Sequence, residues 1–469
     1  MPSIRVGPSP STFTVVSPSA AAAVVHEHKT PISRRRERWL TSCWKAARVL
    51  AATLLNAAVS AVFAWLSAAC FSLGNVLTGR TAREQSYATY LVGTLLWVHL
   101  FFCASVWVAQ AVPLVGLRLL SAPATPTPTT LTLRRCLWLL LRRSLAWFLV
   151  SGGVVAGIAV ACSRLAPHWR RYKLELYTSA PWNYSFLAVV NAAARRVYRR
   201  QSVEGASRST PSRVTPARRH SWLLVSLALT VAYIHMIRFL PTLQRQSHVT
   251  WLVLGSLALK IAAQELARVY ILRADVQSPR AMAALVCVPT VLIDTQVRIA
   301  LLRQLKAAAT LSGVASMALG ELASRVLKAV VTALQVRRGA RRRPDAAAFA
   351  AWKRQVLFHH MTELSAEMHA EYIAIGCSYA VFVCFQHHPH YDLWTPENDG
   401  NASFLTASQR VVALQLLAQL VVDYLSCLLE VRNGMSFAFL DRERPYLLVL
   451  FVALALSSVN ISAMLHLKG

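Results

Sequence analysis

Acidic residues are scarce in this 469-residue chain, which holds 20 Asp and Glu against 50 Lys and Arg. So few carboxylates leave little material for paired-acid chemistry on sugars or phosphates. The chain also lacks a G-x-S-x-G nucleophile motif, a Walker phosphate loop and a G-x-G-x-x-G fingerprint. Enzymatic activity is therefore the weaker expectation, and the sequence identifies no cofactor.

A disulfide framework is not expected either. The nine cysteines are odd in number and include no C-x-x-C pair. Most of them lie inside apolar stretches, where cysteine behaves as a small hydrophobic residue.

Long apolar stretches dominate what the chain does contain. Hydrophobic residues make up 55% of it, and the mean hydropathy is +0.42. A helix needs about 20 apolar residues to cross about 30 Å of hydrocarbon. The sequence therefore predicts an all-α, polytopic integral membrane helical bundle with about nine transmembrane segments. These are expected at 49–73, 87–117, 144–163, 221–237, 251–272, 281–302, 372–386, 411–429 and 446–466.

Basic and Pro-rich breaks divide this bundle into groups. Residues 1–48 are expected to form a disordered basic tail ahead of 49–73, which has the character of an uncleaved signal anchor. The further units are a front transmembrane group at 49–163, a basic loop or linker at 164–220, a middle group with polar stripes at 221–335, a basic linker at 336–351 and a back group at 352–469.

The formal charge of +30 would point to nucleic acid in a soluble protein. Here the basic residues cluster beside apolar spans, as at Arg34–Arg38 and Arg195–Arg200. No RNA-module aromatic motif and no zinc-finger spacing accompanies them. We expect positive-inside topology and attraction to anionic lipid headgroups, with no nucleic-acid partner. Span length does not distinguish the plasma membrane from an endomembrane.

Loop charges predict the orientation. The basic N-terminus should face the cytosol, whereas 387–404 has no Lys or Arg and holds a glycosylation sequon at Asn401, which suits the opposite side. The C-terminus is then expected to be lumenal or extracellular.

The segment 164–220 conflicts with this scheme. Simple alternation places it outside with the sequon at Asn183, yet it carries 12 basic residues. Either 144–163 is re-entrant, broken at Ser151-Gly-Gly and compensated by a pass at 307–324, or a long loop crosses despite its charge. The sequence leaves both open.

Three apolar spans carry ionisable residues near their middle: Lys260, Asp294 and Asp423. A charge at that depth costs about 2.5–3.5 kcal/mol on insertion scales, so it needs partners or water. Other polar residues recur three or four positions away, which places them on one helix face. The predicted polar intramembrane core comprises Lys260, Gln264, Glu265, Arg268, Thr290, Asp294, Arg298, Gln419 and Asp423.

We call these polar helix faces, in 251–272, 281–302 and 411–429, the polar stripes. Two further features accompany them. Pro289, five residues before Asp294, removes a backbone donor and is a candidate hinge. His360, Glu363, Glu367 and Glu371 share one helix face and suit zinc, manganese or iron, although no HExxH motif supports that metal site.

Two functions follow as hypotheses. The first is a transporter or channel-like protein with a polar intramembrane core. The second is a structural or scaffolding membrane protein, whose ion pairs hold the bundle together and whose basic segments 201–220 and 336–348 dock lipids or cytosolic partners.

Overall fold

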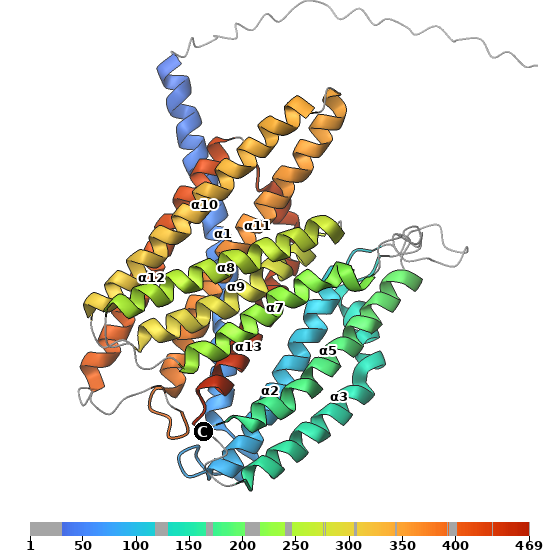
Figure 1. The fold of residues 1–469 in the computed structure, drawn as a ribbon, viewed down its shortest axis with the longest axis vertical. Coiled ribbons are helices and arrows are strands. Elements are labelled where there is room, and N and C mark those ends of the chain that lie inside the picture. Colours follow the sequence, from blue (N-terminus) through green and yellow to red (C-terminus); the bar gives the residue numbers. More distant parts are fainter. Residues whose placement is uncertain are drawn as a thin grey trace, which may run out of the picture.

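The computed structural model describes residues 31–117, 130–165, 172–201, 216–239, 246–274, 276, 278–303, 307–342, 345–391, 393, 401–433 and 435–468. Within these ranges it contains helices and no strand, which confirms the all-α prediction (Figure 1). The long helices are α1 (Pro31–Leu73), α2 (Tyr87–Ala111), α3 (Leu133–Ser163), α5 (Leu174–Gln201), α7 (Pro216–Phe239), α8 (Gln246–Ala274), α9 (Pro279–Leu302), α10 (Ala307–Arg342), α11 (Ala346–Phe385), α12 (Asn401–Arg432) and α13 (Ala438–His466).

Seven helices of the described residues are long and apolar enough to cross a membrane, namely α1, α2, α3, α9, α11, α12 and α13. They fit a multi-pass membrane protein, but they are fewer than the nine predicted spans. Two predicted spans, 221–237 and 251–272, are not among the seven. In 251–272 the charges of Lys260, Glu265 and Arg268 interrupt the apolar sequence.

Apolar side chains also lie on the outside of the bundle, which fits a multi-pass membrane protein. Leu55 and Leu66 of α1, Leu149 of α3 and Leu319 and Leu327 of α10 are all exposed. The outer face of α10 is therefore apolar although its inner face is charged.

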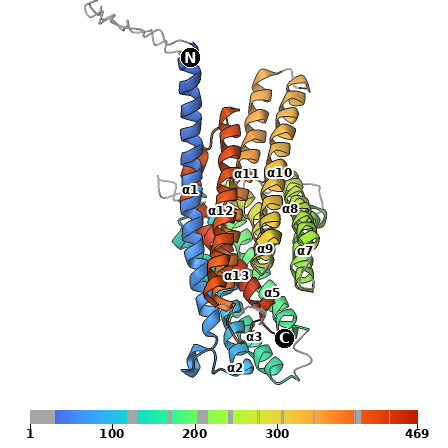
Figure 2. The ribbon, with the colours of Figure 1, turned by 90° about the vertical axis from the view of Figure 1, so that its left-hand side faces the viewer.

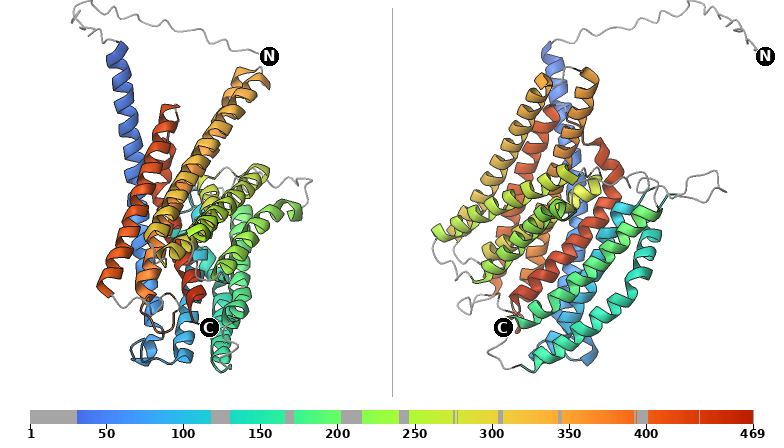
Figure 3. Two further views of the ribbon diagram at one scale, coloured as in Figure 1. Left: turned by 60° about the vertical axis from the view of Figure 1, so that its left-hand side comes forward. Right: turned by 45° about the vertical axis from the view of Figure 1, so that its right-hand side comes forward.

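The helices surround a central pair, α9 and α11. These two pack along each other, and α9 is buried over most of its length. Around them lie α1, α12, α10, α8 and α13 (Figure 2). The helices α2, α3 and α5 pack together beside α13, while α7 lies against α8 (Figure 3). At the α1–α11 contact a Cβ on Gly376 would lie 2.7 Å from the Cβ of Ala61, so this close approach requires glycine.

Successive long helices run in alternating directions (Figure 1). One end of the bundle therefore holds the start of α1, the C-terminal ends of α2, α5 and α10, and the starts of α3, α7 and α11. We call this the N-terminal end. Several basic runs occur there, including 195–200 and 337–342.

The segment 164–220 is not the predicted loop, because residues 174–201 form α5. Asn183 lies within α5, where its buried Oδ1 accepts a hydrogen bond from His99 Nδ1 at 2.9 Å. The alternative of a re-entrant 144–163 is also wrong, since α3 continues through Ser151-Gly-Gly. Because α5 runs back toward the N-terminal end of the bundle, its basic C-terminal turn lies at the same end as the basic start of α1 (Figure 1).

The predicted N-terminal tail and the predicted linker 336–351 are both partly helical. Residues 31–48 extend α1 and are not a disordered tail, while 1–30 lie outside the described residues. Most of 336–351 is also helical, with α11 capped where Asp345 accepts a hydrogen bond from Ala347 N at 2.9 Å. Asn401 begins α12, but its side chain lies outside the described part, so its glycosylation stays a prediction.

The opposite end of the bundle contains a half-buried histidine, His388, beyond the apolar spans. Nε2 of His388 donates to Ser72 O at 3.1 Å, and its Nδ1 accepts from His390 N at 3.2 Å. Burial lowers the pKa of His388 from 6.5 to about 4, and the positive charges of His390, Arg83 and Lys468 act in the same direction. The folded protein therefore keeps this imidazole neutral.

Acidification should destabilise this end. In the unfolded chain His388 binds a proton below pH 6.5, whereas in the folded chain it does so only near pH 4. The contribution of the neutral imidazole to stability is therefore complete above pH 6.5 and is lost as the pH falls below that value. Between pH 6.5 and 4, the folding equilibrium constant decreases by up to about tenfold per pH unit. Thermal unfolding between pH 7.5 and 4.5 should show a smaller drop for His388→Gln than for the parent. His387→Gln, on the exposed neighbour, is the control and should behave like the parent.

A candidate ion pathway

Lys260 is surrounded by three carboxylates from three other helices. Its Nζ lies 2.8 Å from Asp294 Oδ2 on α9, 2.9 Å from Glu371 Oε1 on α11 and 3.2 Å from Glu321 Oε1 on α10. All four side chains are buried. An ammonium group has three donors, so these carboxylates satisfy it completely. The predicted stripes of 251–272 and 281–302 therefore do face one another.

Asp423 joins the same network through an arginine. Arg325 of α10 pairs with both Glu371 and Asp423, and it donates to Ser426 Oγ at 3.4 Å. Gln419, one turn before Asp423, donates to Asp423 Oδ1 at 3.1 Å and also bonds to Glu371. Glu371 is the central residue, since it contacts two cations and one amide.

A second group of paired side chains lies along α11 toward the N-terminal end. Lys328 of α10 pairs with Glu363 at 2.9 Å and with Glu367. It also donates to Gln264 Oε1 at 3.0 Å, while Gln264 Nε2 donates to Thr290 Oγ1 at 3.0 Å. A separate pair lies beside it, in which His360 Nε2 and Glu430 Oε1 are 2.7 Å apart.

Helix periodicity explains this alignment. On α11 the three glutamates are spaced by four residues, and on α10 the acid and two bases are spaced by four and three. Each set therefore lies on one face, and the two faces are opposed. We call the resulting set the ion-pair cluster: Lys260, Gln264, Thr290, Asp294, Glu321, Arg325, Lys328, His360, Glu363, Glu367, Glu371, Gln419, Asp423 and Glu430.

Some predicted core residues lie elsewhere. Glu265 and Arg268 pair with each other at 3.5 Å, and their side chains are 46% and 24% exposed. Arg298 is buried and donates to Gln415 Oε1 at 3.2 Å. Pro289 is buried within an uninterrupted α9, so its role as a hinge stays a prediction.

The predicted metal set is divided among different partners. His360 pairs with Glu430, Glu363 and Glu367 contact Lys328, and Glu371 contacts Lys260 and Arg325. A different trio, formed by Asp294, Glu321 and Glu371, has carboxylate oxygens within 4.8 Å of one another. We call it the carboxylate triad. The ammonium group of Lys260 lies where these oxygens converge.

The formal charges of the cluster do not balance. Its carboxyl groups are Asp294, Glu321, Glu363, Glu367, Glu371, Asp423 and Glu430, and its bases are Lys260, Arg325 and Lys328. With nearby Arg298 added, seven acids face four bases, a formal excess of three negative charges when His360 is left out of the count. A buried uncompensated charge costs several kcal/mol. Protonation of some of these acids, or a cation bound among them, would lower that cost.

A pocket leads to the cluster from the N-terminal end. It has a volume of about 650 Å³ and lies between α8, α9, α10 and α11. Glu265, Arg268 and Gln335 line its wall, and His360 and Glu363 lie at its inner boundary. Water and small ions in this pocket can reach the first carboxylates of the cluster.

Glu321, Arg325 and Lys328 are not among the residues predicted from the sequence, where 307–324 is considered only as a possible additional pass. Their signal is nonetheless present, because one acid and two bases occupy one face while Leu319, Leu327 and other apolar residues occupy the other. Such a helix has the same two-sided character as the three predicted stripes.

No protein-family model matches the chain, and no curated protein or solved structure is significantly similar to it. Seven apolar helices fit a multi-pass membrane protein, and any more specific function must be inferred from the ion-pair cluster.

Proposed function

We propose that this multi-pass membrane protein transports cations or protons along the ion-pair cluster. The observation that carries the proposal is the excess of carboxylates over bases in three neighbouring, mostly buried groups of paired side chains aligned along α11. Ionisable residues inside membrane bundles commonly mark ion paths and proton relays. An acidic excess attracts cations and excludes anions.

The carboxylate triad is the proposed inner binding site. Lys260 acts there as a tethered cation, and its ammonium must move away or share the triad when a mobile cation enters. Glu321 Oε2 is buried and has no hydrogen-bond partner among the described residues, so this carboxylate has an acceptor to offer. The cation enters through the pocket at His360 and Glu363 and passes Glu367 before it reaches the triad.

The structural function remains the second candidate because Lys260 and Arg325 are so fully paired. Interhelical polar contacts of this kind also hold bundles together, at an average of about 0.6 kcal/mol each. On that hypothesis, substitutions that neutralise these charged side chains lower the abundance of the protein, and neither the parent nor the variants transport ions.

Transport by proteoliposomes tests the proposal. The purified full chain is reconstituted, and influx is followed with a pH-sensitive dye for protons and a quenched dye for Mn²⁺. We expect Asp294→Asn and Asp423→Asn to lower flux about tenfold or more, because each removes an attractive charge worth at least about 1.4 kcal/mol in the barrier.

The control removes an ion pair elsewhere. Glu443 of α13 pairs with Arg280 of α9 outside the cluster, so Glu443→Gln should retain parental flux. The double variant Lys260→Met with Asp294→Asn removes a whole ion pair and should fold without transporting. Parental flux in both single Asn variants, or no flux of either ion in the parent, would refute the proposal.

A further inference from the structure

A second pocket lies away from the ion-pair cluster, between α1, α11 and the start of α13. Its volume is about 350 Å³. We infer that this pocket binds the phosphate headgroup of an anionic phospholipid from the surrounding leaflet. The inference is independent of the proposed transport function.

The charge of the pocket favours an anion. Lys45, Arg48 and Arg444 line it, with Asp441 as the one acid among its lining residues. Arg48 and Asp441 lie 3.8 Å apart and are both largely exposed, so solvent screens this pair. The pocket retains two positive charges after the pair is counted.

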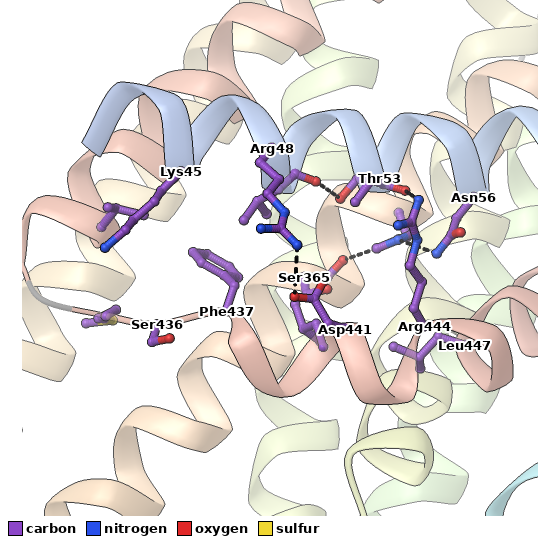
Figure 4. A pocket seen from close by; sticks show the side chains of 16 residues that line it. Lys45, Arg48, Thr53, Asn56, Ser365, Ser436, Phe437, Asp441, Arg444 and Leu447 are labelled. Atoms are coloured by element: carbon purple, nitrogen blue, oxygen red, sulfur yellow. Dashed lines mark hydrogen bonds and ion pairs between the residues drawn. The ribbon is translucent and has the colours of Figure 1, made fainter. Parts of the chain in front are cut away.

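Arg444 is the residue best placed to hold a phosphate. In Figure 4 its side chain reaches from α13 toward α1, near Thr53 and Asn56. It donates to Ala52 O over a long 3.5 Å contact, and within the described residues no carboxylate lies within ion-pair distance of it. A guanidinium offers five donors in a planar fork that matches two phosphate oxygens.

The inner wall adds neutral polar groups. His369 and Asn56 are buried there, with His369 Nε2 and Asn56 Nδ2 3.5 Å apart. His369 Nδ1 donates to Ser365 O at 2.7 Å, since a carbonyl only accepts. The imidazole is thereby held against Phe451, with ring centroids 4.3 Å apart. These contacts fix the wall that a headgroup would meet.

The position and lining favour a lipid over free phosphate. Trp44 precedes Lys45 and is 74% exposed, and Trp39, five residues earlier, is also exposed, as in the aromatic belt of a membrane interface. Val49, Leu440 and Leu447 supply apolar walls that a glycerol backbone and acyl chains would cover. A free phosphate ion would gain nothing from such walls.

Lipid titration of the full chain in neutral detergent tests the inference. Phosphatidylglycerol, phosphatidylcholine and inorganic phosphate are each added, and the thermal unfolding midpoint and retained lipid by native mass spectrometry are measured. We expect phosphatidylglycerol alone to stabilise the protein. Arg444→Gln should raise its half-maximal concentration about fivefold, the effect of one basic residue near an anionic surface.

Two substitutions make the result specific. Arg341→Gln removes an exposed arginine of α10 at the N-terminal end of the bundle but outside the pocket, and it should titrate like the parent. If Arg444→Gln fails to fold without lipid, Lys45→Gln on the exposed rim should show the same weakening. Equal effects of Arg341→Gln and Arg444→Gln, stabilisation by phosphatidylcholine, or equal stabilisation by inorganic phosphate would overturn the inference.

Discussion

Glu371→Gln is expected to cost about 3–5 kcal/mol of stability, the effect of breaking a buried ion pair from one side. Glu371 contacts Lys260, Arg325 and Gln419, which come from α8, α10 and α12. Glutamine keeps the shape of the side chain but leaves two buried cations with less negative charge beside them. The destabilisation comes from those cations and not from a loss of packing.

Thermal and denaturant unfolding in a constant detergent or nanodisc would measure the effect. Glu443→Gln is the matched control because its pair with Arg280 is also interhelical, with side chains 16% and 12% exposed, but lies outside the cluster. A second test combines Glu371→Gln with Arg325→Gln. If charge imbalance is the cause, the double variant should be more stable than the sum of the single effects indicates.

Equal small losses for Glu371→Gln and Glu443→Gln would show that the cluster is wet and screened. In that case the count of uncompensated charges would lose its energetic meaning, and the argument for a cation path would weaken with it.

The sequence predicts which faces of the helices are polar better than it predicts which side chains contact one another between helices. Lys260, Asp294 and Asp423 could be identified because a charge in an apolar span needs shelter. Periodicity gives the face of each helix but not its neighbour, so the direct partner of Asp423 proved to be Arg325 of α10. The glutamates of α11 were read as metal ligands for the same reason, because their cations come from helices distant in sequence.

Helix α5 illustrates a different limit. Twelve basic residues and a sequon made 164–220 look like a loop, and hydropathy alone supports that reading. The helix forms because it is amphipathic and packs on α2 and α3. Its buried Phe186 and Val190 contribute to the core formed by those three helices. The basic composition of 164–220 as a whole therefore gave no indication of the apolar face of α5.

Lys260→Met is expected to convert the carboxylate triad into a divalent-cation site. In the parent the three oxygens converge on Nζ at 2.8, 2.9 and 3.2 Å, so the lysine occupies the place of a bound cation. Methionine fills similar space without charge. The variant alone should be destabilised by about 3–5 kcal/mol, because three buried carboxylates lose their shared partner.

Added Mn²⁺ should then reverse much of that loss, since carboxylate oxygens are preferred ligands of this ion. At about 100 times its dissociation constant, a ligand specific for the folded state stabilises by about 2.7 kcal/mol. The unfolding midpoint of Lys260→Met should therefore rise with Mn²⁺ concentration, while that of the parent stays constant. Adding Glu321→Gln and Asp294→Asn to the variant should abolish the response.

This experiment separates the two functions more directly than loss of flux does. A bundle held together by ion pairs predicts only that Lys260→Met is unstable, whatever ion is added. A cation site with a tethered ammonium predicts that a free cation replaces the missing one at the same oxygens. Rescue by Mn²⁺ that depends on the triad would establish that the oxygens around Nζ can hold a mobile ion, which any transport along the cluster requires.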